Sequence, residues 1–362
     1  MASEWRKTTL GEFVRLQRGH DLAAVERKPG DYPVMGSAGP NGTHGEFIAR
    51  GPGVVIGRSG ASMGRVHFTL DDYWPHNTCL YVTDFLGNDP RFAFYLLGSL
   101  DLASYNSGSA QPSLNRNYIY TKPIQFPPPE EQRAIAETLS ALDDRIDNLR
   151  QINATLEAIA AALFKSRFVD FDGVPPEGMQ ESELGLIPNA WRVGTVSNLA
   201  EIKGGKQLEK EHFDQQGDNP IFGGAGEMGR TDLSNADGLV ITVGRVGAYC
   251  GQFFWHLGSA WVNNNASRIV VGDDAGFWLY WVLRHVDIDK IKKGAAQPFV
   301  SNGDLAAMHI VIPDDATIQE FNSLACDLHR RMSLLSQQVA TLAALRNGLL
   351  PRLISGQLRV SQ

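Results

Sequence analysis

The stretch WRKTTLGEFVRLQRG, residues 5–19, returns later in the chain as WRVGTVSNLAEIKGG, residues 191–205. Other pieces recur at the same offset of about 186 residues. IGRSGA (from Ile56) returns as VGRVGA (from Val243), SAQP (109–112) returns as AAQP (295–298), and Trp74 returns as Trp261. The chain is therefore an internal repeat, and each copy holds a compact mixed segment followed by one long helix.

Length and composition indicate a globular protein with two domains. The chain has 362 residues, enough for two hydrophobic cores, with 43% hydrophobic and 20% charged side chains. No apolar run approaches 18 residues and the N-terminus lacks a secretory apolar core, so we expect a cytoplasmic protein with no membrane partner. Cys79, Cys250 and Cys326 are isolated, which favours buried or idle thiols over a disulfide frame or a metal site.

The net charge of −7 comes from one part of the chain. Residues 128–172 carry five basic and nine acidic side chains, and residues 173–190 carry three acidic ones, which together account for the whole −7. The two compact segments are close to neutral. A neutral globule can still present one basic face, but the charge gives no positive support for DNA binding.

Both compact segments predict an α/β (α+β) fold. Apolar runs typical of strands occur at corresponding places, namely GVVIG, CLYV and PIQF in the first copy and GLVITVG, SRIVV and HIVIP in the second. A helical stretch lies between them, residues 91–105 and 276–291. Gly, Asn, Ser and Pro are dense between these runs, so both copies are expected to be rich in loops.

The long helices are predicted by apolar residues at every seventh position. The first series is Ile135, Leu142, Leu149, Leu156 and Leu163, and the second is Phe321, Leu328, Leu335, Leu342 and Leu349. Leu139 and Ile146 add the alternate seam position in the first helix. Such spacing is typical of a helix that packs along a helical partner, so we expect an antiparallel coiled-coil pair within the chain. A helix buried inside one larger domain is the alternative.

Residues that favour a helix N-terminus stand at the start of both long helices. PPPEEQ opens the first helix and PDDATIQE opens the second, with Pro, Glu, Asp and Thr where helix N-termini favour them. Each helix is expected to span roughly 35 residues, or about 50 Å. Asn153 falls on the second seam, where it either sets the register or faces solvent.

These observations predict five segments. Residues 1–127 form the first globular domain, 128–172 the first spacer helix, 173–190 a Pro/Gly-rich acidic linker, 191–313 the second globular domain and 314–362 the second spacer helix. The whole is a pseudo-two-fold internal repeat in which two similar domains are joined by two long helices.

Three short stretches resemble catalytic or cofactor-binding motifs but lack the residues or the flanking structure that such motifs require. FGGAG (222–226) has the glycine pattern of a methyltransferase cofactor loop, but loop sequence flanks it, so a tight turn is the better interpretation. KGGK (203–206) lacks the first glycine and the Ser or Thr of a phosphate loop. Glu201 and Lys203 have the spacing of a nuclease fragment, which is frequent by chance, and the first copy has no carboxylate there. The histidines show no metal-ligand spacing.

Three stretches carry a resemblance to a known family. Residues 156–191 resemble the central conserved region of type I restriction–modification specificity (S) subunits, and residues 345–360 resemble their distal conserved region. Residues 108–139 resemble the end of a first recognition domain that runs into its spacer helix. The resemblance covers the whole chain, although the globular domains match more in layout than in letters.

The resemblance implies a non-catalytic subunit that reads a bipartite, asymmetric target in double-stranded DNA, one half per recognition domain. It implies that the two helices set the gap between the half-sites and dock two modification (methyltransferase) subunits, which bind S-adenosylmethionine and methylate adenine. It also implies restriction subunits that translocate DNA with ATP and cleave it. We therefore expect no cofactor in this chain, with S-adenosylmethionine, ATP and Mg held by the partners.

Candidate DNA-binding residues are side chains with paired donors and acceptors on corresponding loops. In the first copy they are Arg58, Ser59, Ser62, Arg65, Ser109, Gln111, Asn115 and Arg116. In the second they are Arg245, Asn263, Asn264, Asn265, Lys292, Lys293, Gln297 and Asn302. The bland interpretation is that the glycines only make turns and the asparagines brace strands. Gln111 and Gln297 recur in both copies, which favours a backbone or structural role over base reading.

Two other functions remain open from the sequence. One is an enzyme, a stand-alone DNA methyltransferase or nuclease, against which the missing cofactor and metal spacings speak. The other is a coiled-coil adaptor without DNA contact, which the near-neutral domains keep open. Binding to randomised duplexes separates the DNA-reading subunit from the adaptor.

Overall fold

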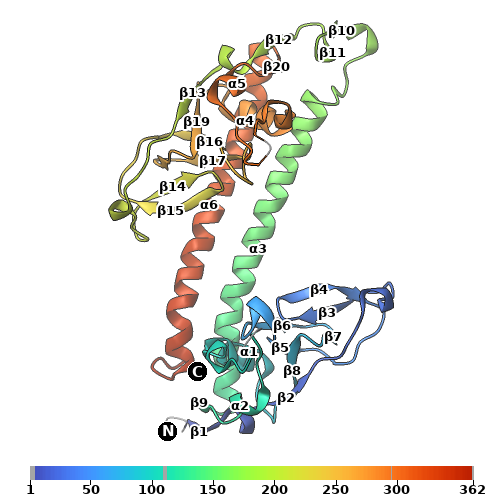
Figure 1. The fold of residues 1–362 in the computed structure, drawn as a ribbon, viewed down its shortest axis with the longest axis vertical. Helices are drawn as coiled ribbons and strands as arrows, with labels where there is room; N and C mark the ends of the chain where they lie inside the picture. The colour runs from blue at the N-terminus through green and yellow to red at the C-terminus, as the bar shows by residue number, and fades with distance from the viewer. Residues whose placement is uncertain (1–4, 109–111, 295, 361–362) are drawn as a thin grey trace. The chain divides into compact units, whose positions relative to one another are not determined.

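The computed structural model describes residues 5–108, 112–294 and 296–360. The chain divides into two compact units, each containing one globular repeat and parts of both long helices (Figure 1). Unit 1 consists of Met1–Asn148 and Val339–Gln362, and unit 2 consists of Leu149–Gln338.

The described residues of the first repeat form nine strands and two short α-helices before its long helix. In chain order these are β1 (Arg6–Thr9), β2 (Arg15–Arg18), β3 (Tyr32–Gly36), β4 (Gly39–His44), β5 (Gly53–Gly57), β6 (Val66–Thr69), β7 (Trp74–Pro75), β8 (Cys79–Asp84), α1 (Pro90–Ser99), α2 (Arg116–Ile119), β9 (Pro123–Phe126) and α3 (Pro129–Phe168). Short 3₁₀ turns connect them, among them η3 (Gly60–Ser62).

The second repeat has the same elements in the same order. They are β12 (Arg192–Thr195), β13 (Ala200–Gly204), β14 (Asn219–Gly223), β15 (Gly226–Thr231), β16 (Leu239–Gly244), β17 (Phe253–Leu257), β18 (Trp261–Val262), β19 (Ala266–Val271), α4 (Gly276–His285), α5 (Asn302–Ala306), β20 (His309–Ile312) and α6 (Asp315–Ile354). The strands and helices predicted from the apolar runs are therefore confirmed in both copies.

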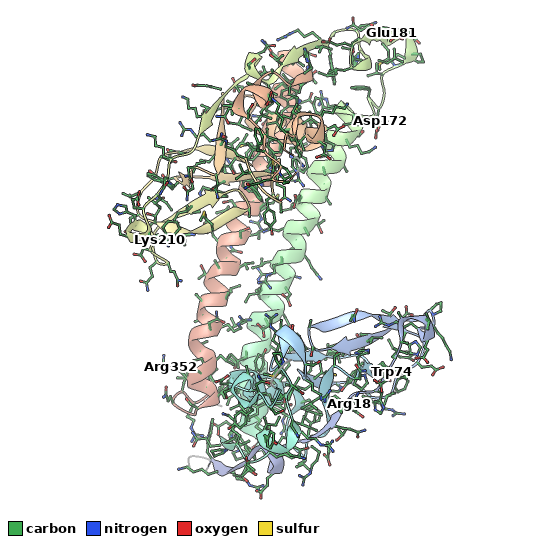
Figure 2. All side chains as sticks on the ribbon, viewed as in Figure 1. Arg18, Trp74, Asp172, Glu181, Lys210 and Arg352 are labelled. Atoms are coloured by element: carbon green, nitrogen blue, oxygen red, sulfur yellow. The ribbon has the colours of Figure 1, made fainter. Side chains whose placement is uncertain are left out.

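The sheets of the two repeats have identical topology. Each repeat has a two-stranded sheet (β1-β9; β12-β20), a four-stranded sheet (β2-β8-β5-β6; β13-β19-β16-β17) and a three-stranded sheet (β4-β3-β7; β15-β14-β18). The four-stranded sheets are antiparallel, while the last strand of each three-stranded sheet, which carries Trp74 or Trp261, pairs in parallel. Figure 2 labels Trp74 in the first repeat.

Each globule is closed by a helix that packs on its four-stranded sheet. Phe92, Leu96 and Leu97 of α1 belong to the core of unit 1, and Trp278 and Trp281 of α4 belong to the core of unit 2. Asp89 caps α1, since its Oδ1 accepts from the Phe92 N–H at 2.8 Å, and Pro90 follows at the first helical position.

Buried amides fix the long helices to these short ones. Gln132 of α3 is fully buried and its Oε1 accepts from the Asp89 N–H at 2.9 Å. Asn322 of α6 accepts from the Phe277 N–H at 2.8 Å and donates to the Asp273 carbonyl at 2.8 Å. The spacer helix of each repeat therefore completes the helix terminus of its own globule.

The two long helices, α3 and α6, each contain 40 residues. Asp314 caps α6, since its carboxylate accepts from the Thr317 N–H at 2.9 Å and from its hydroxyl at 2.8 Å. These bonds lower the pKa of Asp314. The carboxylates at the start of α3 and the cations Lys165 and Arg167 in its last turn match the helix dipole.

Both units pair α3 and α6 in opposite directions. In unit 1, Asp143 pairs with Arg346 at 2.7 Å and the earlier Glu131 pairs with the later Arg359 at 2.7 Å. In unit 2, Arg167 pairs with Glu320 at 2.7 Å. Asn153 donates to the Met332 carbonyl at 3.3 Å and to Ser336 Oγ at 3.0 Å. Asn153 thus contacts the partner helix, and its role in setting the register stays a prediction.

The predicted seam residues of α3 are buried or half-buried up to Leu156, and those of α6 along the whole series. The exception is Leu163, which is 40% exposed. Ala160, Phe164 and Phe168 are buried instead. A helix with 3.6 residues per turn drifts relative to a strict seven-residue repeat. The stripe therefore moves to Phe164, which packs on the rings of Trp281 and Phe321, and the prediction for Leu163 was wrong.

The segment 173–190, predicted as a linker without regular structure, contains a hairpin. Strands β10 (Met179–Ser182) and β11 (Gly185–Pro188) pair in antiparallel register, and a 3₁₀ turn (Pro176–Gly178) precedes them. Gln180 ties the hairpin to the second globule by donating to the Trp191 carbonyl at 2.8 Å. Among the described residues, no helix is long and apolar enough to cross a membrane.

Candidate nucleic-acid interface

Each repeat brings together two loops that carry candidate DNA-binding residues. One is the Gly-Arg turn, which begins at Gly57 or Gly244, and the other is the Gln-Pro loop, which contains SAQP or AAQP and the residues on either side. In the first repeat, Ser59 forms an isolated bridge with Ser113, and the Leu114 N–H donates to the Arg58 carbonyl at 2.8 Å. In the second, Val246 bridges Phe299, and the Val300 N–H donates to the Arg245 carbonyl at 2.9 Å. We call these the first turn–loop site (58–65 with 112–116) and the second turn–loop site (245–251 with 296–302).

The residue that directly precedes strand β8 or β19 completes each site. The Arg58 N–H donates to the Thr78 carbonyl at 2.9 Å, and the Arg245 N–H donates to the Asn265 carbonyl at 3.1 Å. Gly57 lets the turn fold back on the end of β5, since a Cβ there would lie 2.1 Å from the Ser62 carbonyl oxygen. The sites are therefore built on rigid strand ends, and their exposed side chains are free to differ between repeats.

In the first site, the structure gives some predicted residues a structural task. Arg58, Ser59 and Ser62 are half-buried, and Arg65 is exposed. Asn115 caps α2 by accepting from the Asn117 N–H at 3.0 Å. Arg116 donates to the Leu16 carbonyl at 2.9 Å. Two further predicted residues, Ser109 and Gln111, lie outside the described residues.

In the second repeat, the asparagine run braces the loop as the bland interpretation suggested. Asn263 is buried and its Oδ1 accepts from the Asn264 N–H at 2.7 Å. Asn264 reaches Gln207 at 3.4 Å. Several buried polar atoms have no partner within the described chain, and two of them belong to this site, Arg245 Nε and Asn265 Oδ1. Unsatisfied polar atoms of this kind are suited to a polar ligand.

The remaining residues of the second site are engaged in local contacts. Lys292 pairs with Asp289 at 2.7 Å, and Lys293 pairs with Asp304 at 2.7 Å. The hydrogen bond from Lys293 lowers the pKa of Asp304. Asn302 accepts from Ser267 Oγ at 2.6 Å. Gln297 is exposed. The DNA contacts assigned to all these residues stay predictions.

The candidate catalytic fragments have ordinary structural roles. FGGAG lies in the turn between β14 and β15, a strand-to-strand connection, as the tight-turn interpretation required. Glu201 and Lys203 form an exposed ion pair at 2.7 Å. Burial raises the pKa of Cys79 to about 12, which keeps this thiol protonated at neutral pH. No group of metal-ligating side chains occurs among the described residues.

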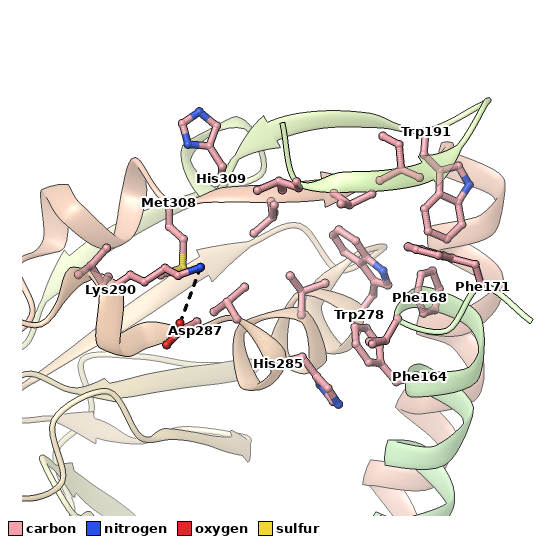
Figure 3. A pocket seen from close by; sticks show the side chains of 18 of the residues that line it. Phe164, Phe168, Phe171, Trp191, Trp278, His285, Asp287, Lys290, Met308 and His309 are labelled. Atoms are coloured by element: carbon pink, nitrogen blue, oxygen red, sulfur yellow. Dashed lines mark ion pairs between the residues drawn. The ribbon is translucent and has the colours of Figure 1, made fainter. Parts of the chain in front are cut away.

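Sequence reasoning missed an aromatic pocket in unit 2, shown in Figure 3. It has a volume of about 710 Å³ and lies between the end of α3, the hairpin β10–β11 and helix α4. Phe168 lies at one side of it, and its ring is 5.6 Å from the Trp191 ring and 6.3 Å from the Trp278 ring. At the opposite side, Asp287 and Lys290 form an ion pair at 3.7 Å.

The rim of this pocket exposes apolar side chains of the hairpin, Leu184 and Leu186, and of the end of α3, Val169. These residues fall within the 156–191 segment that resembles a conserved region. An open aromatic pocket with an apolar rim is typical of a surface that receives another protein. The only sequence signal was the density of Phe and Trp from Phe164 to Trp191.

Comparison with known proteins defines the class. The chain belongs to the family of the type I restriction modification DNA specificity domain, whose family model matches residues 2–158 and again residues 188–322. Each matched range covers one globular domain and the first part of the long helix that follows it.

Individual relatives agree. A type I restriction enzyme specificity subunit of Methanocaldococcus jannaschii is 26% identical over 301 residues, which cover 75% of this chain and 70% of the relative. A putative type I specificity subunit of Mycoplasma genitalium is 23% identical and covers 96% of this chain and 93% of its own. The crystal structure of a type I restriction-modification S subunit from M. genitalium shares the fold, with a TM-score of 0.74, 18% identity and coverage of 98% and 96%.

Proposed function

We propose that this chain is the DNA sequence-specificity subunit of a type I restriction–modification complex and reads a bipartite, asymmetric target. The observation that supports this most is the turn–loop site, which occurs in both repeats on the same strands but carries different side chains. A shared frame suits a shared task, and different side chains suit different half-sites.

The proposal assigns the chemistry to other subunits. This chain holds no cofactor and catalyses no reaction; S-adenosylmethionine, ATP and Mg belong to the modification and restriction subunits. Two observations are consistent with this division: FGGAG forms a turn between two strands, and the Cys79 thiol stays protonated.

The partners of this chain are double-stranded DNA, two modification subunits and the restriction subunits. We place one docking site for a modification subunit at the aromatic pocket around Phe168 and its rim. Leu186→Glu should then lower the number of modification subunits that co-purify with the chain from two to one, while the chain still folds. Leu70→Glu, at an exposed position in the first repeat, is the control and should leave assembly unchanged. Equal assembly of both variants would remove the docking site from the proposal.

The two long helices set the gap between the half-sites. Because α3 and α6 run antiparallel, a clean deletion removes one heptad from each helix, residues 147–153 and 336–342. Seven helical residues correspond to about 10 Å, and one base pair to about 3.4 Å, so the gap should shorten by about three base pairs. An assembled complex with an unchanged gap would contradict this role.

The main experiment maps the target. The reconstituted complex of this chain and the modification subunits is given a library of randomised duplexes, and the methylated adenines are mapped. We expect two different short motifs at a constant spacing. A complex that assembles but methylates without sequence preference would overturn the proposal.

One observation favours a second function, the coiled-coil adaptor without DNA contact. The two lysines of the second Gln-Pro loop, Lys292 and Lys293, are both neutralised by carboxylates. The adaptor would support assembly and leave the DNA preference of the complex unchanged when either turn–loop site is altered. The same mapping experiment separates the two functions.

A further inference from the structure

The two turn–loop sites differ most at the isolated bridge at their centre. The first repeat places Ser59 opposite Ser113, and the second places Val246 opposite Phe299. At a third position, Ser62 in the first turn corresponds to Tyr249 in the second. Two serine hydroxyl groups of the first repeat are thus replaced by apolar side chains in the second, and a third is replaced by a tyrosine, which adds a large aromatic ring.

These apolar side chains are held at the surface. Val246 is 42% exposed, Tyr249 is 51% exposed and Phe299 is 40% exposed. Residues directly opposite each other across an antiparallel bridge project to the same face, so Val246 and Phe299 lie side by side. Gly294 lets the loop that carries Phe299 turn tightly, because a Cβ there would lie 2.5 Å from the Gln297 carbonyl oxygen. Such exposure adds nothing to the core of the domain, which points to a ligand.

The neighbouring arginine is the same in both repeats. Arg58 and Arg245 occupy corresponding positions and use their backbone in corresponding hydrogen bonds. A residue that is shared by sites with different targets is suited to holding the phosphate backbone, whereas residues that differ are suited to reading bases. The charge therefore positions this surface on DNA, and the residues at the bridge face the base edges.

We propose that Val246 and Phe299, together with Tyr249, are specificity-determining residues that recognise the 5-methyl group of thymine in the second half-site. Ser59, Ser62 and Ser113 read the first half-site through hydrogen bonds. The inference rests on the proposed function and names the chemistry of its readout. In the major groove only thymine offers a methyl group, and apolar side chains are its natural partners.

The test compares the wild-type chain with the variant Val246→Ser/Tyr249→Ser/Phe299→Ser, which gives the second site the side chains of the first. Leu233→Ser, at another exposed apolar position of the same domain, is the matched control. Each chain is assembled with the modification subunits, and its target is mapped from randomised duplexes. Thermal melting checks that all three chains fold. Binding is then measured on the wild-type target with thymine or with deoxyuridine, which lacks the methyl group.

We expect deoxyuridine in the second half-site to weaken binding of the wild type and of the Leu233→Ser control by about 5- to 10-fold. The triple variant should bind both duplexes equally and lose its preference at that base pair, while the first half-site and the gap stay the same.

Two results would overturn the inference and leave the proposed function intact. In one, the folded triple variant keeps the wild-type motif. In the other, the second half-site contains no thymine or tolerates deoxyuridine without loss. A wild-type complex that enriches no sequence would overturn the proposed function and this inference with it.

Discussion

The two repeats have the same fold, but one corresponding position in their long helices holds an ion-paired carboxylate in unit 1 and a neutral aromatic ring in unit 2. In unit 1, Asp143 accepts a hydrogen bond from Tyr95 at 2.6 Å and pairs with Arg346 at 2.7 Å. In unit 2 the corresponding residue of α6 is His329, and fully buried Ala160 stands where Arg346 would be.

His329 packs among aromatic rings, and the charged groups nearest to it, Glu157 and Arg284, are paired with each other at 2.6 Å. It stacks on Phe277 at 4.1 Å and meets Trp255 at 4.8 Å. Its Nδ1 donates to the Ala325 carbonyl at 2.7 Å, while Nε2 has no partner within the described chain. Burial lowers the pKa of His329 to about 4. The comparison teaches that this position accepts either a paired charge or a neutral ring, but not an unpaired charge.

The largest effect is expected from His329→Asp, which puts the residue of unit 1 into the aromatic surroundings of unit 2. The arginine near this position, Arg284, is already paired with Glu157 at 2.6 Å, so the new carboxylate would have no partner of its own and the free energy of unfolding should fall by about 3–5 kcal/mol. His329→Phe is the control and should be close to neutral, because it keeps the ring and removes the unpaired nitrogen. Thermal and urea unfolding measure both. Equal stabilities for the two variants would break the comparison.

Arg346→Met makes the matching change in unit 1 by removing the partner of Asp143. Asp143 keeps the hydrogen bond from Tyr95, and the pair is partly exposed, so the expected loss is about 1–3 kcal/mol. Adding Asp143→Asn should restore part of this loss, because the unpaired charge disappears. A double variant that is less stable than Arg346→Met would contradict the assignment.

The pH dependence should differ between the two positions. His329 has a folded pKa of about 4, below the usual value of 6.5, so the unfolded chain takes up a proton first as the pH falls. The neutral ring therefore contributes stability above pH 6.5 that is lost between pH 6.5 and 4, by up to about 3 kcal/mol. His329→Phe should flatten the stability curve in this window. An unchanged slope in that variant would assign the pH dependence to other groups.

The smallest effect is expected at Asn153, whose counterpart in α6 is Val339. Asn153 Oδ1 has no partner, so Asn153→Val should raise the free energy of unfolding by about 0.5–1 kcal/mol. Polar residues on such seams specify register, so disulfide trapping between the helices should detect more than one register in the variant. A destabilised variant with a single register would contradict this role.

Much of the fold could be predicted because it follows from periodicity and repetition. The apolar runs gave the strands, the seventh-position residues gave both long helices, and PDDAT gave the Asp314 cap. The hairpin at Met179–Pro188 was missed because its strands are short and its side chains mixed. The prediction for Leu163 was wrong because contacts with an aromatic core determine which residues in the last turns of α3 are buried. A local sequence repeat carries no information about those contacts.

The site was only partly predictable for a related reason. The sequence identified the turns and loops, but not which of their side chains are engaged in contacts within their own domain. Asn115 as a helix cap and Arg116 as a tie to β2 depend on local geometry. Val246 and Phe299 escaped notice because apolar residues in a loop suggest burial until their exposure is known.

The account depends most on the claim that each repeat reads its own half-site through the same frame. The direct test replaces residues 191–313 with a second copy of residues 5–127 and maps the methylated target of the reassembled complex. Because α3 and α6 run in opposite directions within each unit, the account predicts a target of two identical, inverted half-sites with the original first motif. An assembled, active complex that keeps the asymmetric wild-type target would contradict it.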